Sequence, residues 1–243
     1  MLKKLLIAAG VLLVIIVAGV AYLASNLDSI VKRAIETLGP EMTGVSVKVG
    51  KVGITLTEGR GEIGGLVVGN PKGYREPHAF KLGSIVLAMD PATVTKDVIV
   101  IRELTIEAPD MIYEKGPGGS NVEVIQRHVD DYVKANFGGG RPAPDKAKKG
   151  EAAPAQRFIV ENLQIRNGRV RIAGVAGKDA EVALPPVGLR DVGKSRGGMT
   201  GGEIAGVIVK QMTDAMAAAA ARALAQEGLK RGTDALKDRL LTR

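Results

Sequence analysis

The chain has 243 residues, a length that allows one sizeable hydrophobic core. It has no cysteine, which excludes disulfide bonds and cysteine-ligated metal sites, and its 3% of aromatic residues requires a core of aliphatic side chains and methionine. The net charge of +8 favours an acidic neighbour such as anionic lipid headgroups. Nucleic acid is not an expected partner, because the few aromatic residues are not interleaved with a basic run.

Residues 5–24 form an uncharged, apolar run that follows Lys3 and Lys4. As a helix this run spans about 30 Å, the thickness of the hydrocarbon core of a bilayer. A cleaved signal peptide is the alternative, but its apolar region is usually about 7–15 residues long. The run therefore predicts a membrane anchor built on Leu5, Leu6, Ile7, Val11, Leu12, Leu13, Val14, Ile15, Ile16, Val17, Val20 and Leu23.

Lys3 and Lys4 also predict the orientation of this anchor. Basic residues favour the cytoplasmic side of a membrane, so residues 1–4 are expected in the cytoplasm and the chain after residue 24 on the other side. Lys32 and Arg33 lie beyond the far end of the run and weaken this prediction, although acidic residues accompany them.

Residues 25–137 are predicted to be a strand-rich region that opens with an amphipathic helix. The helix carries apolar residues at helical spacing from Leu27 to Leu38 and stops at Gly39-Pro40. Alternating apolar residues then predict strands near 45–49, 52–56 and 85–89. Gly59, Gly61 and Gly64 have the spacing of a dinucleotide-binding loop, but a strand pattern rather than a helix follows them, so we expect bends or bulges there.

The segments 99–113 and 158–172 share one design. Ile101, Leu104 and Ile106 correspond to Val160, Leu163 and Ile165, and the apolar alternation slips by one residue at the same point in both. This shared slip predicts a shared bulge or strand break.

The second segment contains Asn167-Gly168, a strong signal for a two-residue hairpin. A hairpin there would place Ile165 opposite Val170 and Leu163 opposite Ile172 on one face. On the other face it would gather a basic patch that an acidic partner could bind, although a solvated surface is the favoured interpretation: Arg166, Arg169 and Arg171.

The strands together predict one apolar sheet face. Its expected members are Val52, Ile54, Leu56, Ile85, Leu87, Leu163, Ile165, Val170 and Ile172.

Three further segments complete the predicted organisation. A short helix is expected at about 122–135, where His128 has no second ligand or catalytic partner at a useful spacing. Residues 138–156 are rich in Gly, Pro, Ala and Lys and predict a flexible basic linker, either within one sheet or between two lobes; the repeated strand design favours one sheet. Residues 157–200 are then a second hairpin region of that sheet.

Residues 201–243 are predicted to be helical. Thr200 and Glu203 have capping-box spacing, and an alanine-rich stretch follows at 215–225. The amphipathic last turns could lie on the sheet, pair with another subunit or return to the membrane interface. The fold class is therefore α+β: a transmembrane helix, then a mainly antiparallel, twisted sheet with an amphipathic helix at its start, an inserted helix and a C-terminal alanine-rich helix.

The order of these features resembles the N-terminal part of AsmA-like proteins. The resemblance is carried by the segments 36–39, 43–52, 61–71, 73–74, 79–83 and 100–104, and it covers about residues 1–114 well and 157–210 more loosely. It implies a bacterial inner-membrane anchor, a periplasmic β-rich body and a role in outer-membrane biogenesis or lipid homeostasis. It carries over no catalytic residues.

Two functions follow as expectations. The first is a lipid-handling accessory whose sheet shelters an acyl chain or assists a larger partner, because the chain has too few strands to cross the periplasm alone. The second is a structural interaction module whose apolar face is fully covered by helices. We expect no enzymatic activity, cofactor or metal; the expected partners are the lipid bilayer, phospholipid and other envelope proteins.

Overall fold

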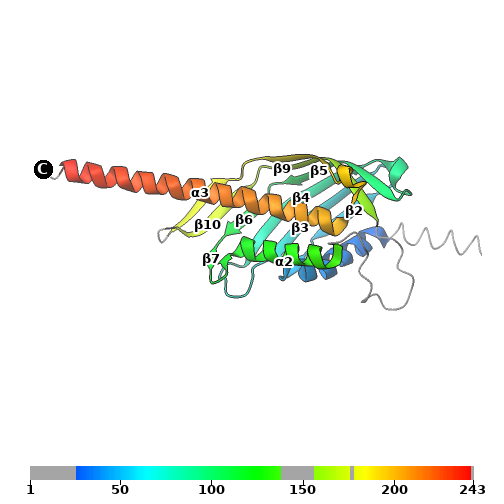
Figure 1. Cartoon of the computed structure of the whole chain (residues 1–243), viewed down its shortest axis with the longest axis horizontal. Helices are drawn as coiled ribbons and strands as arrows, with labels where there is room; N and C mark the ends of the chain where they lie inside the picture. The colour runs from blue at the N-terminus through cyan, green and yellow to red at the C-terminus, as the bar shows by residue number, and fades with distance from the viewer. Residues whose placement is uncertain (1–25, 138–155, 176–177, 242–243) are drawn as a thin grey trace, which may run out of the picture.

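The computed structural model describes residues 26–137, 156–175 and 178–241, which form a mixed α+β fold (Figure 1). The predicted anchor at 5–24 and almost all of the predicted linker at 138–156 lie outside this part of the chain. Within it are three helices, which cover residues 26–43, α2 (Asn121–Phe137) and α3 (Gly201–Leu241). The strands are β1 (Val47–Lys48), β2 (Lys51–Thr55), β3 (Arg60–Gly69), β4 (His78–Met89), β5 (Val98–Glu107), β6 (Asp110–Tyr113), β7 (Lys115–Gly116), β8 (Gly119–Ser120), β9 (Arg157–Arg166), β10 (Arg169–Val175), β11 (Lys178–Ala183), β12 (Val187–Val192) and β13 (Met199–Thr200).

All strands except the β7–β8 hairpin belong to one 11-stranded sheet. Several of them lie end to end. β1 and β2 both pair with β3, and β5 and β6 both pair with β4. Next, β9 pairs with β5 and β10 with β6; on their other side, β12 pairs with β9 and β11 with β10. The sheet thus consists of six long strands in the order β1–β2, β3, β4, β5–β6, β9–β10 and β11–β12, and β13 pairs with β9 in line with β12. Its pairing is mostly antiparallel, as predicted.

The two segments of similar design lie side by side. β5–β6 and β9–β10 run parallel, and each residue stands opposite its own counterpart: Ile101 pairs with Val160, and Met111 with Val170. A bulge is present in the first segment, because the register between β4 and β5 shifts where Ala88 and Met89 face the residues around Arg102. The described pairs of β9 with β5 and β12 show no such shift, so the prediction holds for one segment.

The predicted hairpin at Asn167-Gly168 is wrong. Asn167 alone takes a left-handed conformation (φ 55°), and the chain continues as β10 in the direction of β9. The equivalent residue of the first segment, Ala108, has the same conformation (φ 47°). Asn tolerates this conformation in a hairpin and also at a single break in a strand, so the dipeptide could not distinguish them.

These breaks belong to a line that crosses the whole sheet, which we call the crease. Each long strand has a glycine or proline at this level: Gly50, Gly65, Gly83, Pro109, Gly168 and Pro185. A Cβ at Gly50 would lie 2.9 Å from the Gly64 carbonyl oxygen, and one at Gly83 would lie 3.0 Å from that of Glu107. At these two positions the backbones approach so closely that a side chain does not fit.

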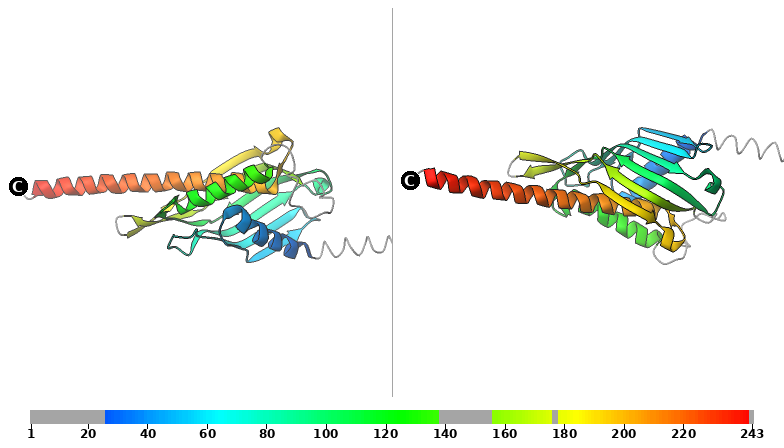
Figure 2. Two further views of the ribbon diagram at one scale, coloured as in Figure 1. Left: turned by 60° about the horizontal axis from the view of Figure 1, so that its bottom comes forward. Right: turned by 90° about the horizontal axis from the view of Figure 1, so that it is seen from above.

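The helices lie on one face of the sheet (Figure 2). Helix α2 begins at a capping box, in which the Ser120 N–H donates to Glu123 Oε2 and the Glu123 N–H to Ser120 Oγ. The predicted capping box of α3 is confirmed by the same pair of bonds between Thr200 and Glu203. Satisfying the free amides of the first turn in this way fixes where each helix starts.

Helix α3 continues well beyond the sheet (Figure 1). Its buried residues Met212, Met216, Ala219 and Ala220 recur at helical spacing, and among the side chains that the structure describes in α3, Ala223 is the furthest along the helix that packs against the core. The next positions of that arc, 227, 230 and 234, are charged residues in the sequence. A charged arc cannot pack on an apolar sheet, which explains why the helix leaves the body there and why Leu229 is 73% exposed.

Candidate functional site

One face of the sheet is formed by aliphatic rows that cross all six long strands. Residues directly opposite each other share a face, so the registers define each row. The two rows on one side of the crease are Val52, Ile63, Ile85, Ile106, Ile165 and Val187, and Ile54, Gly61, Leu87, Leu104, Leu163 and Leu189. Beyond the crease the row is Val47, Val68, Phe80, Met111, Val170 and Val182.

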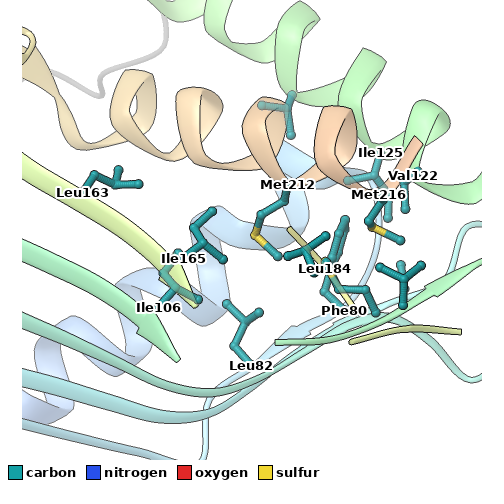
Figure 3. Close-up of a cluster of buried hydrophobic side chains, with 14 of the residues drawn as sticks. Phe80, Leu82, Ile106, Val122, Ile125, Leu163, Ile165, Leu184, Met212 and Met216 are labelled. Carbon is teal, nitrogen blue, oxygen red and sulfur yellow. The ribbon is translucent and has the colours of Figure 1, made fainter. Parts of the chain in front are cut away.

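Helices α2 and α3 cover the middle of this face. Leu163, Ile165 and Val170 have no exposed surface and Ile172 has 2%, so four of the nine predicted face residues are core residues. Figure 3 shows Met212 and Met216 of α3 and Val122 and Ile125 of α2 above them. This part of the face is closed to any ligand.

The end of the face at β2, β3 and β4 is only partly covered. Val52, Ile54, Ile63, Ile85 and Leu87 are half-buried there, and Leu56 is 37% exposed. We call these six residues the open apolar end. The other five predicted face residues thus differ from the four beneath the helices: none of them is buried.

Helix 26–43 runs along the outer edge of this end. The Ile54 N–H donates to Asp28 Oδ1 (2.8 Å), the Val49 N–H donates to Glu36 Oε1 (3.0 Å), and Lys32 Nζ donates to the Gly50 carbonyl (3.1 Å). These side chains form hydrogen bonds with backbone groups of β2 and of the turn before it that would otherwise have no partner. The helix therefore closes the β1–β2 edge of the sheet.

The same helix presents a second, apolar line away from that edge. Ile30 and Leu38 are 41% and 51% exposed, with exposed Ala34 between them at four-residue spacing. At its last turn the helix meets α2, because a Cβ at Gly44 would lie 2.7 Å from the ring of His128. Towards residue 26 the two helices diverge (Figure 2). Ile30 and Leu38 lie on the outward side of helix 26–43, where they are exposed.

The opposite face of the sheet is polar. Lys51 bridges Glu62 at 2.8 Å, and the hydrogen bond from Lys51 is the main cause that lowers the pKa of Glu62. A shallow hollow on this face is lined by Arg60, Ser84, Glu103, Thr105 and Arg166. The two faces of the sheet therefore have opposite character.

The three arginines of the predicted basic patch all meet carboxylates. Arg166 pairs with Glu107 (3.3 Å) and Arg169 with Glu181 (3.6 Å), while Arg171 pairs with both Glu76 and Asp179. The hydrogen bonds from Glu76 and then Asp179 raise the pKa of Arg171 above its usual value. The arginines are neutralised within the sheet rather than displayed as a cationic cluster.

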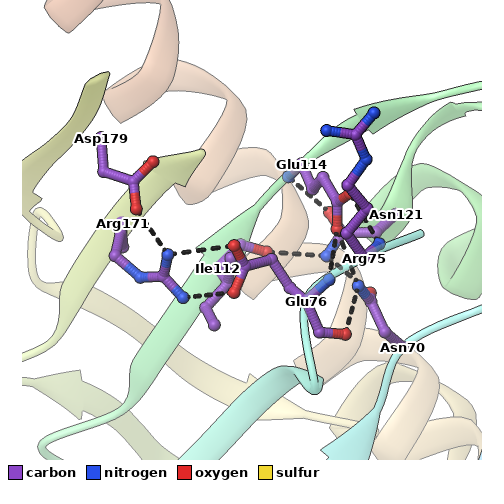
Figure 4. A network of polar contacts seen from close by, with 8 residues as sticks. All are labelled: Asn70, Arg75, Glu76, Ile112, Glu114, Asn121, Arg171 and Asp179. Atoms are coloured by element: carbon purple, nitrogen blue, oxygen red, sulfur yellow. Dashed lines mark hydrogen bonds and ion pairs between the residues drawn. The ribbon is translucent and has the colours of Figure 1, made fainter. Parts of the chain in front are cut away.

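A buried polar network fixes the turn between β3 and β4 (Figure 4). The Glu114 carboxylate is 8% exposed and accepts bonds from the Arg75 and Glu76 backbone N–H groups and from Asn70 Nδ2. Asn121, at the start of α2, donates to Asn70 Oδ1 and to the Ile112 carbonyl. Every bond in this network joins groups of the chain itself, so the network is structural.

The described part of the chain holds no group of three or more His, Asp or Glu side chains that could bind a metal. His128 Nδ1 lies 2.9 Å from the Val124 carbonyl oxygen, one turn earlier in α2, which matches the expectation of a hydrogen-bonded surface histidine. Within the described ranges the candidate site therefore consists of apolar surface at β2–β4.

Among the described helices, residues Gly201–Gln226 of α3 are the one stretch that is long and apolar enough to cross a membrane by composition. A third of that stretch is buried, and it carries the methionines that pack on the sheet. Comparisons of the chain with protein-family models, with curated proteins and with solved structures give no match.

Sequence reasoning missed two features of the site. The division of the apolar face into a covered and an open part depends on where helices dock, which periodicity does not encode. The role of Asp28, Lys32 and Glu36 had a signal, because their spacing of four places them on one side of a helix next to an edge strand.

Proposed function

We propose that the protein is a membrane-tethered accessory of the bacterial envelope that shelters a lipid acyl chain on its open apolar end. One observation carries the proposal: the aliphatic rows are buried beneath α2 and α3 but remain half-exposed at β2–β4. The exposed Ile30 and Leu38 add apolar surface on the outward side of the helix that closes this edge of the sheet. The resemblance to AsmA-like proteins supports the periplasmic location and the link to outer-membrane biogenesis and lipid homeostasis.

The position of this end relative to the chain supports a lipid source in the membrane. Helix 26–43 follows the apolar run 5–24 closely in the sequence. It binds β2, one of the strands of the open apolar end, through the hydrogen bond from the Ile54 N–H to Asp28, so this end of the sheet is tied to the segment that follows the run. Apolar area removed from water gains about 25 cal/mol per Å², so an acyl chain laid across several half-buried side chains is favoured.

The test is native mass spectrometry of full-length protein extracted in a mild detergent. Wild type is expected to retain phospholipid, and the double substitution Ile85→Glu/Leu87→Glu to reduce the lipid-bound fraction at least about fivefold, because it places charge on the apolar face. The control is Ser84→Glu/Val86→Glu, which changes the neighbouring residues that face the other side of β4. Equal loss in both variants, or a wild type without lipid, would contradict the proposal.

A second candidate function is a structural module of an envelope complex. The complete burial of Leu163, Ile165 and Val170 favours it, since that part of the face serves only folding. A wild type that is free of lipid but retains a protein partner in the same measurement would select this function.

A further inference from the structure

The two outer edges of the sheet differ in whether other groups bind their outward backbone N–H and C=O groups. At the β1–β2 edge, three side chains of helix 26–43 bind backbone groups. At the other edge, β12 pairs with β9 alone, and no hydrogen bond within the described ranges reaches its outward backbone groups. A row of unpaired N–H and C=O groups is a template for an added strand.

The side chains of β12 define what such a strand would contain. Val187 and Leu189 end two aliphatic rows and are half-buried against the core. Gly188 and Arg190 point to the polar face, and a Cβ at Gly188 would meet nothing within 4 Å. A hollow there is lined by Asn162, Gln164, Gly188 and Arg190, among others. An added strand would therefore place aliphatic residues beside Val187 and Leu189 and a polar residue over the hollow.

The positive charge of Arg190 determines which polar residue the added strand should carry. Arg190 is exposed and forms no ion pair with the described residues, whereas its neighbours are already paired: Arg166 with Glu107, and Asp191 with Lys194 at 2.9 Å. A carboxylate over the hollow would complete this pattern. A second copy of the chain would instead bring another Arg190 to the same short strand, which like-charge repulsion disfavours.

The flanks limit the length of the added strand. Pro186 has no N–H to offer, and Asp191 is left-handed (φ 54°). We propose that Val187–Arg190 is a docking edge for a short extended segment of a partner protein, with alternating aliphatic residues and one carboxylate set against Arg190. This edge is separate from the open apolar end, so the proposal is independent of the lipid function.

The probe is a fluorescein-labelled eight-residue peptide of alternating valine and threonine in which one threonine is replaced by glutamate. Every second amide is N-methylated, so that only one edge of the peptide can pair. Titrated with full-length protein in nanodiscs, it is expected to bind at least about fivefold more tightly than the same peptide with lysine in place of glutamate. Arg190→Glu is expected to reverse this preference.

Arg33→Glu is the matched control, because it changes the net charge equally on an exposed helix position at the other edge. It is expected to leave the preference unchanged. Hydrogen exchange then locates the binding: the amides of residues 187–190 should slow when the glutamate peptide is added. Equal affinity for both peptides, no slowing at 187–190, or a dimer of the free protein that already protects these amides would overturn the proposal.

Discussion

Glu114 is a buried carboxylate that is held by amide groups instead of a cation. Its two backbone donors, Arg75 and Glu76, belong to the turn between β3 and β4, while Glu114 itself follows β6. The carboxylate therefore joins segments that are far apart in the sequence. Such charge-assisted bonds are each worth more than neutral ones when they are shielded from water.

We expect Glu114→Gln to lower the free energy of unfolding by about 1–3 kcal/mol, because an amide offers one acceptor oxygen and turns its NH2 group towards other donors. Chemical denaturation measures the change. Glu58→Gln, at an exposed turn position, serves as the control and should be neutral. Equal stability of both variants would mean that the network does not hold the turn.

Ala108 lies at the crease in a left-handed conformation that costs a non-glycine residue about 1–2 kcal/mol. Its side chain is exposed, so Ala108→Gly removes strain without a loss of packing and is expected to raise stability by up to about 1 kcal/mol. Ala88→Gly, at an exposed position in β4, should instead cost about 0.5–1 kcal/mol. Thermal unfolding compares them, and a destabilised Ala108→Gly would argue against strain at this position.

At the scale of elements, α3 combines a packed half with a half that leaves the body. Met216 has no exposed surface, whereas Leu224 and Leu229 are 40% and 73% exposed. Helix stability in a protein comes mostly from packing of one face, so the two halves should contribute unequally to folding.

Ending the chain after residue 226 is therefore expected to leave the melting temperature within about 2 °C of wild type, because the side chains that the structure describes beyond this point, such as Leu229, are exposed. Met216→Ala should instead cost about 2–5 kcal/mol. Differential scanning calorimetry distinguishes the two cases. A truncated chain that is destabilised as strongly as Met216→Ala would show that the distal helix supports the fold.

The same contrast explains what could be predicted from the sequence. Local signals succeeded: a short helix was predicted at about 122–135, where α2 lies, and Thr200 with Glu203 predicted the start of α3. Asn167-Gly168 failed because the outcome depended on a partner strand 59 positions earlier, which a local rule does not contain. Five of the six residues of the open apolar end were predicted as members of one sheet face and Ile63 was not. The partial cover of this end depends on where the helices dock, which a local pattern does not contain.

At the scale of the whole molecule, the sheet is organised by the pairing of a segment with its own counterpart. Glu107 and Arg166 stand opposite each other in this parallel arrangement. A hairpin at Asn167-Gly168 would instead have placed Arg166 opposite Arg169. The chain has no native cysteine, so these two arrangements can be distinguished by cross-linking.

We expect Glu107→Cys/Arg166→Cys to form a disulfide on mild oxidation, because residues opposite each other on adjacent strands have Cα atoms within the required range of about 4.4–6.8 Å. Arg166→Cys/Arg169→Cys should remain reduced, because the two residues lie three positions apart along β9 and β10, which continue in one direction instead of facing each other. Non-reducing electrophoresis after proteolysis between the positions reads out the bond. Cross-linking of only the Arg166→Cys/Arg169→Cys pair would contradict the parallel arrangement and support a hairpin at Asn167-Gly168.

The crease has a mechanical consequence. A sheet whose ladder is interrupted at one level in all six long strands has its lowest resistance to bending about that line, so it behaves as two plates joined along Gly50, Gly65, Gly83, Pro109, Gly168 and Pro185. Helix α3 touches β12 and β13 on one plate and β6, β10 and β11 on the other. It therefore acts as a brace that sets the angle between the plates, and a force applied to its projecting end would be transmitted to the curvature of the sheet.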